Sequence, residues 1–222
     1  MTTAEPVVPV EGVPEDAKPQ GPRSQKGART RARLIEAAKE VFEEDGFFDA
    51  RIADISERAG VSYGSFYHYF DSKEQIFRDV AEAADQRLSE PLERVILDPT
   101  STATPRERIR EAIRLHLVAY RDEARIMRVV EQVSRYDDQV RAARLESGAR
   151  YSRQVAGSIR QLQARGLADA ALDPDVAAVV LGSMTGRFAE AWFVEGRVDC
   201  DVDTGADQVA ALFANALQLR DP

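Results

Sequence analysis

The stretch that most constrains the fold of this chain lies at residues 59–73, which read Ala-Gly-Val-Ser-Tyr-Gly-Ser-Phe-Tyr-His-Tyr-Phe-Asp-Ser-Lys. Gly60 can adopt the left-handed backbone that ends a helix, and Ser62 can cap the helix that follows. Asp71 and Ser72 can then start the helix after that one. This order of signals is typical of a helix-turn-helix. The middle helix, residues 63–70, is too short to be stable by itself, so we predict that it serves to enter a DNA major groove.

Two helices are expected before this stretch. Residues 30–45 are apolar at every third or fourth position, and Gly46 follows as a helix stop. Residues 51–59 form a short second helix, for which Asp49 is the expected cap. The three predicted helices together make a small N-terminal domain.

The spacing of the third helix divides its residues between two sides. Val61, Phe66 and Phe70 fall on the side that faces the core of the domain. The outer side is left with Tyr63, Gly64, Ser65, Tyr67 and His68. Tyr69 is placed there as well, with core packing as the alternative.

Charge is distributed unevenly along the chain. The net charge of −8 counts against nucleic-acid binding at first sight, because phosphate contacts need Lys and Arg. Residues 18–33, however, contain six basic residues and no acidic one, whereas residues 81–222 contain 19 basic and 23 acidic residues. The positive charge is therefore concentrated just ahead of the helix-turn-helix, where it can reach DNA. For Lys18 and Arg23, a solvated tail is an equally good interpretation.

Several classes of protein are not supported by the sequence. The only histidines are His68 and His116, and neither clusters with Cys or carboxylates at ligand spacing, so we expect no metal site. No phosphate-binding or dinucleotide-binding glycine motif occurs, so we expect no cofactor and no enzymatic activity. Cys200 stands alone, which fits a reducing compartment. Residues 1–13 lack the features of a signal peptide, and we expect the protein to be cytoplasmic.

The remainder of the chain reads as helical, and no stretch alternates like a strand. A fourth helix starts at residue 72, and Pro91 is expected to kink or break it. Thr104 and Glu107 form a capping box around Pro105, where a central helix begins. Further helices are predicted at residues 124–135, 137–165, 174–194 and about 204–219. The predicted fold is all-α, with about nine helices.

Residues 52–77 resemble the DNA-binding domain of the TetR family of transcriptional regulators. The matching elements are Ile55, Ala59-Gly60-Val61-Ser62, Gly64, Tyr67, Tyr69-Phe70 and Ser72-Lys73-Glu74. One departure is that this chain has Ala50 and Arg51 where family members usually carry a threonine that caps the second helix and contacts phosphate. Arg51 can replace the phosphate contact by its charge.

The resemblance implies roles for individual residues. The hydroxyl group of Tyr67 and the ammonium group of Lys73 would contact phosphates, while Ser62 and its neighbours would lie near the base edges. Tyr63 could contact a thymine methyl group. The predicted DNA-binding residues are Arg29, Arg33, Arg51, Ser62, Tyr63, Gly64, Ser65, Tyr67, His68 and Lys73.

The resemblance also implies how the chain is divided. Residues 1–27 would be a disordered tail, residues 28–75 the helix-turn-helix domain, and residues 76–222 a helical domain for effector binding and dimerisation. The last two helices would meet their copies in a homodimer. Compatible with such an interface are the small residues Gly182, Ser183 and Gly186 and the apolar stripe Val209, Leu212, Phe213, Ala216 and Leu217.

A DNA-binding unit does not need so large a second domain merely to dimerise, so we expect that domain to sense a ligand. The candidate cavity residues are His116, Tyr120, Met127, Phe188 and Trp192, with plain core packing as the alternative for each. The predicted function is a ligand-responsive regulator, a repressor that binds a palindromic operator as a homodimer and is released by a small, mostly apolar effector. The alternative is a constitutive or architectural DNA-binding protein without an effector.

Overall fold

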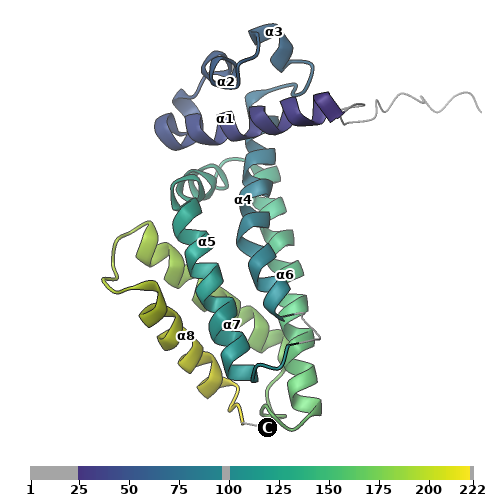
Figure 1. The fold of residues 1–222 in the computed structure, drawn as a ribbon, viewed down its shortest axis with the longest axis vertical. Coiled ribbons are helices and arrows are strands. Elements are labelled where there is room, and N and C mark those ends of the chain that lie inside the picture. Colours follow the sequence, from purple (N-terminus) through teal and green to yellow (C-terminus); the bar gives the residue numbers. More distant parts are fainter. Residues whose placement is uncertain (1–24, 97–100, 221–222) are drawn as a thin grey trace, which may run out of the picture.

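The computed structural model describes residues 25–96 and 101–220, and every regular element in this part of the chain is a helix. The eight helices are α1 (Gln25–Asp49), α2 (Ile52–Arg58), α3 (Tyr63–Phe66), α4 (Lys73–Ile96), α5 (Pro105–Val133), α6 (Asp138–Ala164), α7 (Pro174–Phe193) and α8 (Val202–Ala216). In Figure 1, α1 to α3 form a small upper tier, and α4 descends from it into a larger bundle with α5 to α8. The predicted all-α fold is confirmed.

The first helix begins earlier than the sequence analysis expects. α1 starts at Gln25, so residues 25–27, which we assigned to the tail, are helical. Apolar spacing does not reveal these residues. Gln25 and Lys26 are good helix formers although Gly27 is not, and the hydroxyl group of Thr30 donates to the carbonyl of Lys26. Gly46 interrupts the helical geometry, as predicted, with φ 74° and ψ 178°. Lys18 and Arg23 lie outside the described residues.

The core of the upper tier is aromatic. Phe42, Phe66, Phe70 and Phe77 are each at most 1 % exposed, and they come from α1, α3, the turn after α3, and α4. The rings of Phe42 and Phe77 meet edge to face, with centroids 5.0 Å apart. α4 supplies part of this core and then continues into the bundle, so it joins the two tiers.

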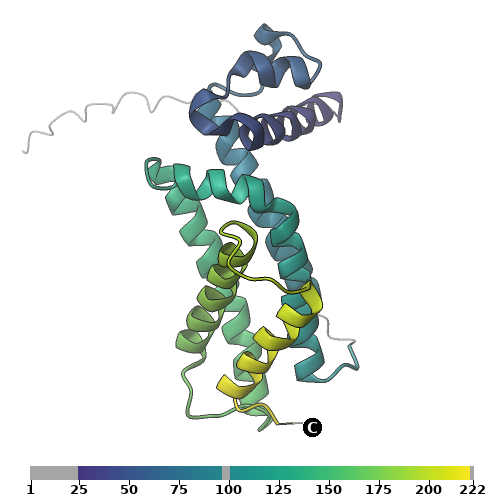
Figure 2. The ribbon, with the colours of Figure 1, turned by 90° about the vertical axis from the view of Figure 1, so that its left-hand side faces the viewer.

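One of the predicted helix boundaries is wrong. The helix expected at residues 124–135 is the last part of α5, because no Gly or Pro interrupts residues 106–133. Figure 2 shows that these last turns of α5 bend across the top of the bundle, beneath α1. α4 continues past Pro91 to Ile96, close to the end that we expected near Leu97, so Pro91 does not break the helix. The chain consequently has eight helices in its described part rather than about nine.

The caps of the later helices agree with the sequence. Thr104 and Glu107 form the predicted capping box at the start of α5, and Asp173 accepts hydrogen bonds from the first turn of α7. α8 begins at Val202, slightly earlier than expected, because the side chain of Asp201 caps it. In the part of the chain described here, no helix is both long enough and apolar enough to cross a membrane.

The apolar stripe of α8 has a different role from the one we expected. Val209, Phe213 and Leu217 are at most 8 % exposed, and α8 packs against α5 of the same chain. Leu212, on the other side of the helix, is 54 % exposed. Three residues of this stripe therefore belong to the core of the protomer. Gly182 likewise faces its own chain, since a Cβ there would lie 3.4 Å from the ring of Tyr151.

The contact between α7 and α8 leaves no room for a side chain at Gly205. A Cβ at this position would lie 2.3 Å from the ring of Trp192, which is 8 % exposed and stacks on Phe193 with centroids 4.6 Å apart. We expect Gly205→Ala to lower the free energy of unfolding by about 1–3 kcal/mol through overpacking. Urea unfolding followed by circular dichroism measures this change.

The matched control for this prediction is Gly157→Ala in α6. A Cβ at Gly157 has no neighbour within 4 Å, so the substitution is expected to raise the free energy of unfolding by about 0.5–1 kcal/mol through lower backbone entropy in the unfolded chain. Equal effects of the two substitutions would contradict the close contact at Trp192.

Candidate nucleic-acid interface and ligand cavities

The turn before α3 is built from the residues that the sequence analysis singled out. Gly60 has φ 64°, a conformation that residues with a Cβ rarely adopt, and this ends α2. Ser62 then caps α3, since its hydroxyl oxygen accepts from the backbone N–H of Ser65 at 3.2 Å. Regular α-helix ends at Phe66 rather than at residue 70. A tighter turn follows, in which the N–H of Tyr69 donates to the carbonyl of Phe66 at 2.9 Å.

The outer side of α3 presents the predicted recognition residues to solvent. Tyr63 and Tyr67 are 54 % and 46 % exposed. Ser62, Gly64 and His68 are also exposed, whereas Ser65 and Tyr69 are half-buried. Phe66 and Phe70 are buried on the opposite side, as predicted. A helix this short is thus held by two phenylalanine rings while its polar side faces outward.

Tyr63 and Tyr67 form a pair on this surface. Their hydroxyl oxygens are 3.0 Å apart, and their rings meet edge to face. The hydrogen bond with Tyr63 raises the pKa of Tyr67 above its ordinary value, so the Tyr67 hydroxyl stays protonated and can donate to a phosphate oxygen. Tyr63 is therefore linked to the hydroxyl group of Tyr67, for which we predicted a phosphate contact.

Lys73 has partners that the sequence did not indicate. Its ammonium nitrogen lies 2.7, 3.1 and 2.9 Å from the carbonyl oxygens of Phe47, Phe48 and Ala50. It also lies 4.8 Å from the centre of the Phe47 ring. An ammonium group has three N–H donors, so these carbonyls use all of them. Lys73 ties the segment after α1 to the start of α4, and the predicted phosphate contact would require it to release a carbonyl.

The basic residues of the upper tier differ in their surroundings. Arg29 and Arg33 are exposed on α1, near its start. Arg31, between them, forms an ion pair with Asp79 of α4 and lies over the ring of Phe70. Arg31 therefore anchors α1, whereas the DNA contacts of Arg29 and Arg33 stay a prediction.

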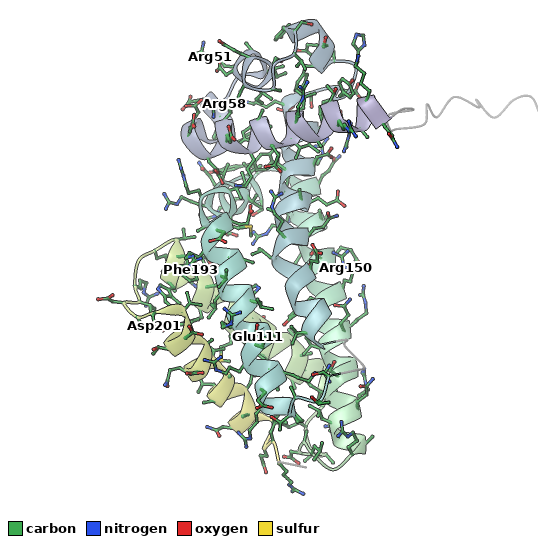
Figure 3. The ribbon with its side chains drawn as sticks, viewed as in Figure 1. Arg51, Arg58, Glu111, Arg150, Phe193 and Asp201 are labelled. Carbon is green, nitrogen blue, oxygen red and sulfur yellow. The ribbon has the colours of Figure 1, made fainter. Side chains whose placement is uncertain are left out.

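α2 carries two arginines at the far end of the molecule, which Figure 3 labels. Arg51 occupies the N-cap position of α2, in place of the expected Asp49, and makes no capping hydrogen bond through its side chain. Its side chain is 80 % exposed and lies 3.8 Å from Asp54. Arg58 instead binds Glu44 at 2.6 Å and so fixes α2 to α1. Sequence reasoning missed this bracing role, which no local pattern reveals.

The five residues predicted to line one ligand cavity are not brought together. His116 lines a cavity of about 190 Å³, while Tyr120 and Met127 line another of about 280 Å³ whose remaining lining is largely charged. Burial raises the pKa of Tyr120 to about 12. Phe188 and Trp192 pack on each other with ring centroids 5.5 Å apart. For these last two, the alternative of plain core packing agrees with the structure.

A further cavity, of about 310 Å³, lies between α5, α6, α7 and α8. Its apolar lining is formed by Ile109, Ala112, Ile113, Val155, Ile159, Leu162, Leu181, Phe213 and Leu217. Polar groups, including Arg108 and Arg165, line another part of it. The volume is at the lower end of the range for small-molecule sites. Among the described residues, no group of three or more His, Cys, Asp or Glu residues has the arrangement of a metal site.

The architecture and the exposed short helix define a protein of the helix-turn-helix class. Residues 34–80 match the model of bacterial regulatory proteins of the tetR family, and residues 102–217 match the tetracyclin repressor-like C-terminal domain. The chain therefore belongs to the TetR family of transcriptional regulators. This family consists of regulators and not of enzymes.

Curated relatives agree with this membership. The HTH-type transcriptional regulator YdgC of Bacillus subtilis is 38 % identical over 73 residues, which are 33 % of this chain and 37 % of the relative. UidR of Escherichia coli is 38 % identical over 68 residues, 29 % of this chain and 35 % of the relative. These matches span little more than a third of either relative. The transcriptional regulator AcuR of Cereibacter sphaeroides is 27 % identical over 80 % of this chain and 81 % of its own.

Solved structures share the fold over nearly the whole chain. A TetR-family regulator from Mesorhizobium loti superposes with a TM-score of 0.75 at 21 % identity, covering 87 % of this chain and 98 % of the other. The fatty acid degradation regulator FadR of Bacillus halodurans superposes with a TM-score of 0.71 at 19 % identity, covering 86 % and 97 %. At these identities the likeness concerns the fold alone.

Proposed function

We propose that this chain is a cytoplasmic, homodimeric repressor that binds a palindromic operator and is released by a small effector. The observation that carries the proposal is the exposed polar side of α3, which Phe66 and Phe70 hold outward at the end of the molecule. Arg29, Arg33 and Arg51 are exposed in the same tier and would add phosphate contacts.

A homodimer is supported by an unpartnered apolar side of α7. Val176, Val179 and Val180 are 61 %, 53 % and 58 % exposed, at a spacing that places them on one side of the helix. Exposed apolar clusters of this kind mark protein contacts. Two copies that meet through α7 would present two recognition helices to successive major grooves, which are about 34 Å apart.

The effector is proposed to occupy the bundle and to act on α4. The cavity of about 310 Å³ would accept the apolar part of a ligand, in place of the five residues that we expected from the sequence. α4 shares packing with α1 above and with α5 and α6 below. A ligand that favours one arrangement of these helices would change the spacing of the two recognition helices and weaken operator binding.

The proposal is tested by mapping the binding sites of the protein across its genome and measuring its affinity for the site found. Tyr67→Phe is expected to weaken binding about three- to tenfold for every sequence, since it removes one hydrogen bond to phosphate. The salt dependence should not change, because the hydroxyl group is uncharged. Tyr63→Ala should alter the preferred sequence in a binding-site selection, and should also weaken binding because the Tyr63 hydroxyl orients that of Tyr67.

Tyr136→Phe is the matched control for these variants. Tyr136 is 75 % exposed but lies after α5, away from the recognition helix, so its substitution should leave operator affinity unchanged. If Tyr67→Phe, like the control, left operator affinity unchanged, the predicted phosphate contact of the Tyr67 hydroxyl group would be wrong. Operator affinity is then measured with fractions of cellular metabolites added. If no fraction changes the affinity, the result favours the alternative of a constitutive DNA-binding protein.

A further inference from the structure

A second, smaller cavity lies where α4, α5, α6 and α7 meet, and polar side chains from all four helices line part of it. It measures about 190 Å³ and is lined by Asp85 from α4, His116 from α5, Arg144, Ser147 and Tyr151 from α6, and Thr185 from α7. Tyr151 also lines the cavity of about 310 Å³, so the two cavities adjoin. A ligand with an apolar part and a polar end could use both.

His116 contributes an acceptor without a donor. Burial lowers the pKa of its imidazole, which is therefore neutral at pH 7, and the ring has a hydrogen bond with the backbone of Leu88. A bond of this kind to a carbonyl places the ring proton on Nε2 and leaves Nδ1 as an acceptor. Nδ1 is buried and has no hydrogen-bond partner within the described part of the chain. Buried polar atoms are nearly always paired, so this one calls for a donor.

Asp85 places a carboxyl group in the same cavity. Burial raises its pKa, while the charges of Arg144 and Arg150 and a hydrogen bond from Ser147 act in the opposite direction. Arg144 itself is held by Glu131 of α5. The hydroxyl group of Thr185 donates to the carbonyl of Leu181 at 3.0 Å, which leaves its oxygen as a further acceptor. The cavity wall therefore offers acceptors from three helices.

We propose that this cavity binds the polar end of the effector, and that this end carries hydroxyl or amino groups that donate hydrogen bonds to Asp85 and His116. The proposal rests on the proposed function, and it adds the chemistry of the ligand. A cavity of about 150 Å³ is large enough for benzene, so the bound group has on the order of six to eight heavy atoms. Arg144 of the cavity wall is bound to Glu131, and a carboxylate has no hydrogen to donate to Nδ1 of His116.

The two histidines of the chain make a direct test possible. Only His68 and His116 contribute imidazole signals, and His68 lies on the exposed recognition surface. Nitrogen NMR of the full-length protein with hexane-1,2-diol, 1-aminohexane or hexanoate compares two donor groups with an anion on the same six-carbon chain. The diol and the amine are expected to shift the Nδ1 resonance of His116, and hexanoate is not; His68 should stay unchanged with all three.

A substitution at Asp85 sharpens the test. Asp85→Asn should weaken binding of the diol about tenfold, the loss expected when one hydrogen bond to a charged group is replaced. Glu82→Gln, one turn earlier on the exposed side of α4, is the matched control and should leave binding unchanged. Retained operator binding shows that both variants are folded.

The possible results separate this proposal from the proposed function. No shift of His116 with either donor probe, or an equal shift with hexanoate, would overturn the proposed ligand chemistry. A shift without any change in operator affinity would support the site and count against its role in repression. Release of the operator by a probe that leaves His116 unshifted would support an effector-responsive repressor while overturning this site.

Discussion

Phe66→Ala is expected to abolish specific operator binding without removing any contact with DNA. Phe66 is fully buried, with its ring centroid 5.6 Å from that of Phe70. α3 has only four residues, and a helix of that length has no stability of its own. The phenylalanine rings below it are what fix its position. Truncation should lower the free energy of unfolding of the upper tier by about 3–5 kcal/mol.

Urea unfolding and gel-shift titration together test this expectation. The unfolding midpoint should fall together with operator affinity in Phe66→Ala. In Tyr67→Phe, by contrast, affinity should fall while the free energy of unfolding stays within about 0.5 kcal/mol of the parent value, as for most surface substitutions. If Phe66→Ala unfolded like the parent protein, α3 would have to be held by contacts other than the two rings.

Glu123→Ala is expected to destabilise the junction between the two tiers. Glu123 of α5 is 7 % exposed, with one carboxylate oxygen 2.8 Å from Nε of Arg87 and the other 3.6 Å from Nζ of Lys39. Its carboxylate thus joins α5 to both α4 and α1. Removing it leaves two partly buried cations with less compensation, and we expect a loss of about 3 kcal/mol in the free energy of unfolding.

A matched control uses the other carboxylate of Arg87. Glu36 lies 3.2 Å from Arg87, but its side chain is 60 % exposed, so Glu36→Gln should cost less than about 1 kcal/mol. The double substitution Arg87→Met and Glu123→Leu removes the pair between α4 and α5 while Lys39 keeps Glu43 at 2.7 Å, and it should recover most of the stability lost in Glu123→Ala. Equal effects of Glu123→Ala and Glu36→Gln would show that the buried carboxylate is not what holds the junction.

The parts of the fold that depend on near neighbours in the chain were predictable. The turn at Gly60, the cap at Ser62, the capping box at Thr104 and the starts of α6 and α7 each depend on residues within a few positions of one another. The burial of Phe66 and Phe70 followed from helical spacing. Errors occurred where spacing carries no signal, as in residues 25–27, which are helical without any apolar residue among them.

The candidate sites were predictable only in part. Asp85 lies beside Ala84 and Leu88 on the buried side of α4. An acidic residue at such a position was a signal that could have identified Asp85 as part of a site. A comparable acid between apolar residues of α5 marks Glu123. His116 was recognised because a histidine on an apolar side must find a partner. Its cavity partners come from three other helices, and no spacing rule connects them.

The sequence by itself determined the helix-turn-helix, the all-α class and the family, because these depend on local spacing and on an ordered set of residue types. The tertiary structure decided how side chains are shared between distant segments: the ammonium group of Lys73 binds the carbonyls of Phe47, Phe48 and Ala50, and the stripe of α8 faces α5. It also decided which buried atoms of the bundle face a cavity. Such assignments depend on how whole helices pack, and helical spacing specifies which residues share a side but not what that side meets.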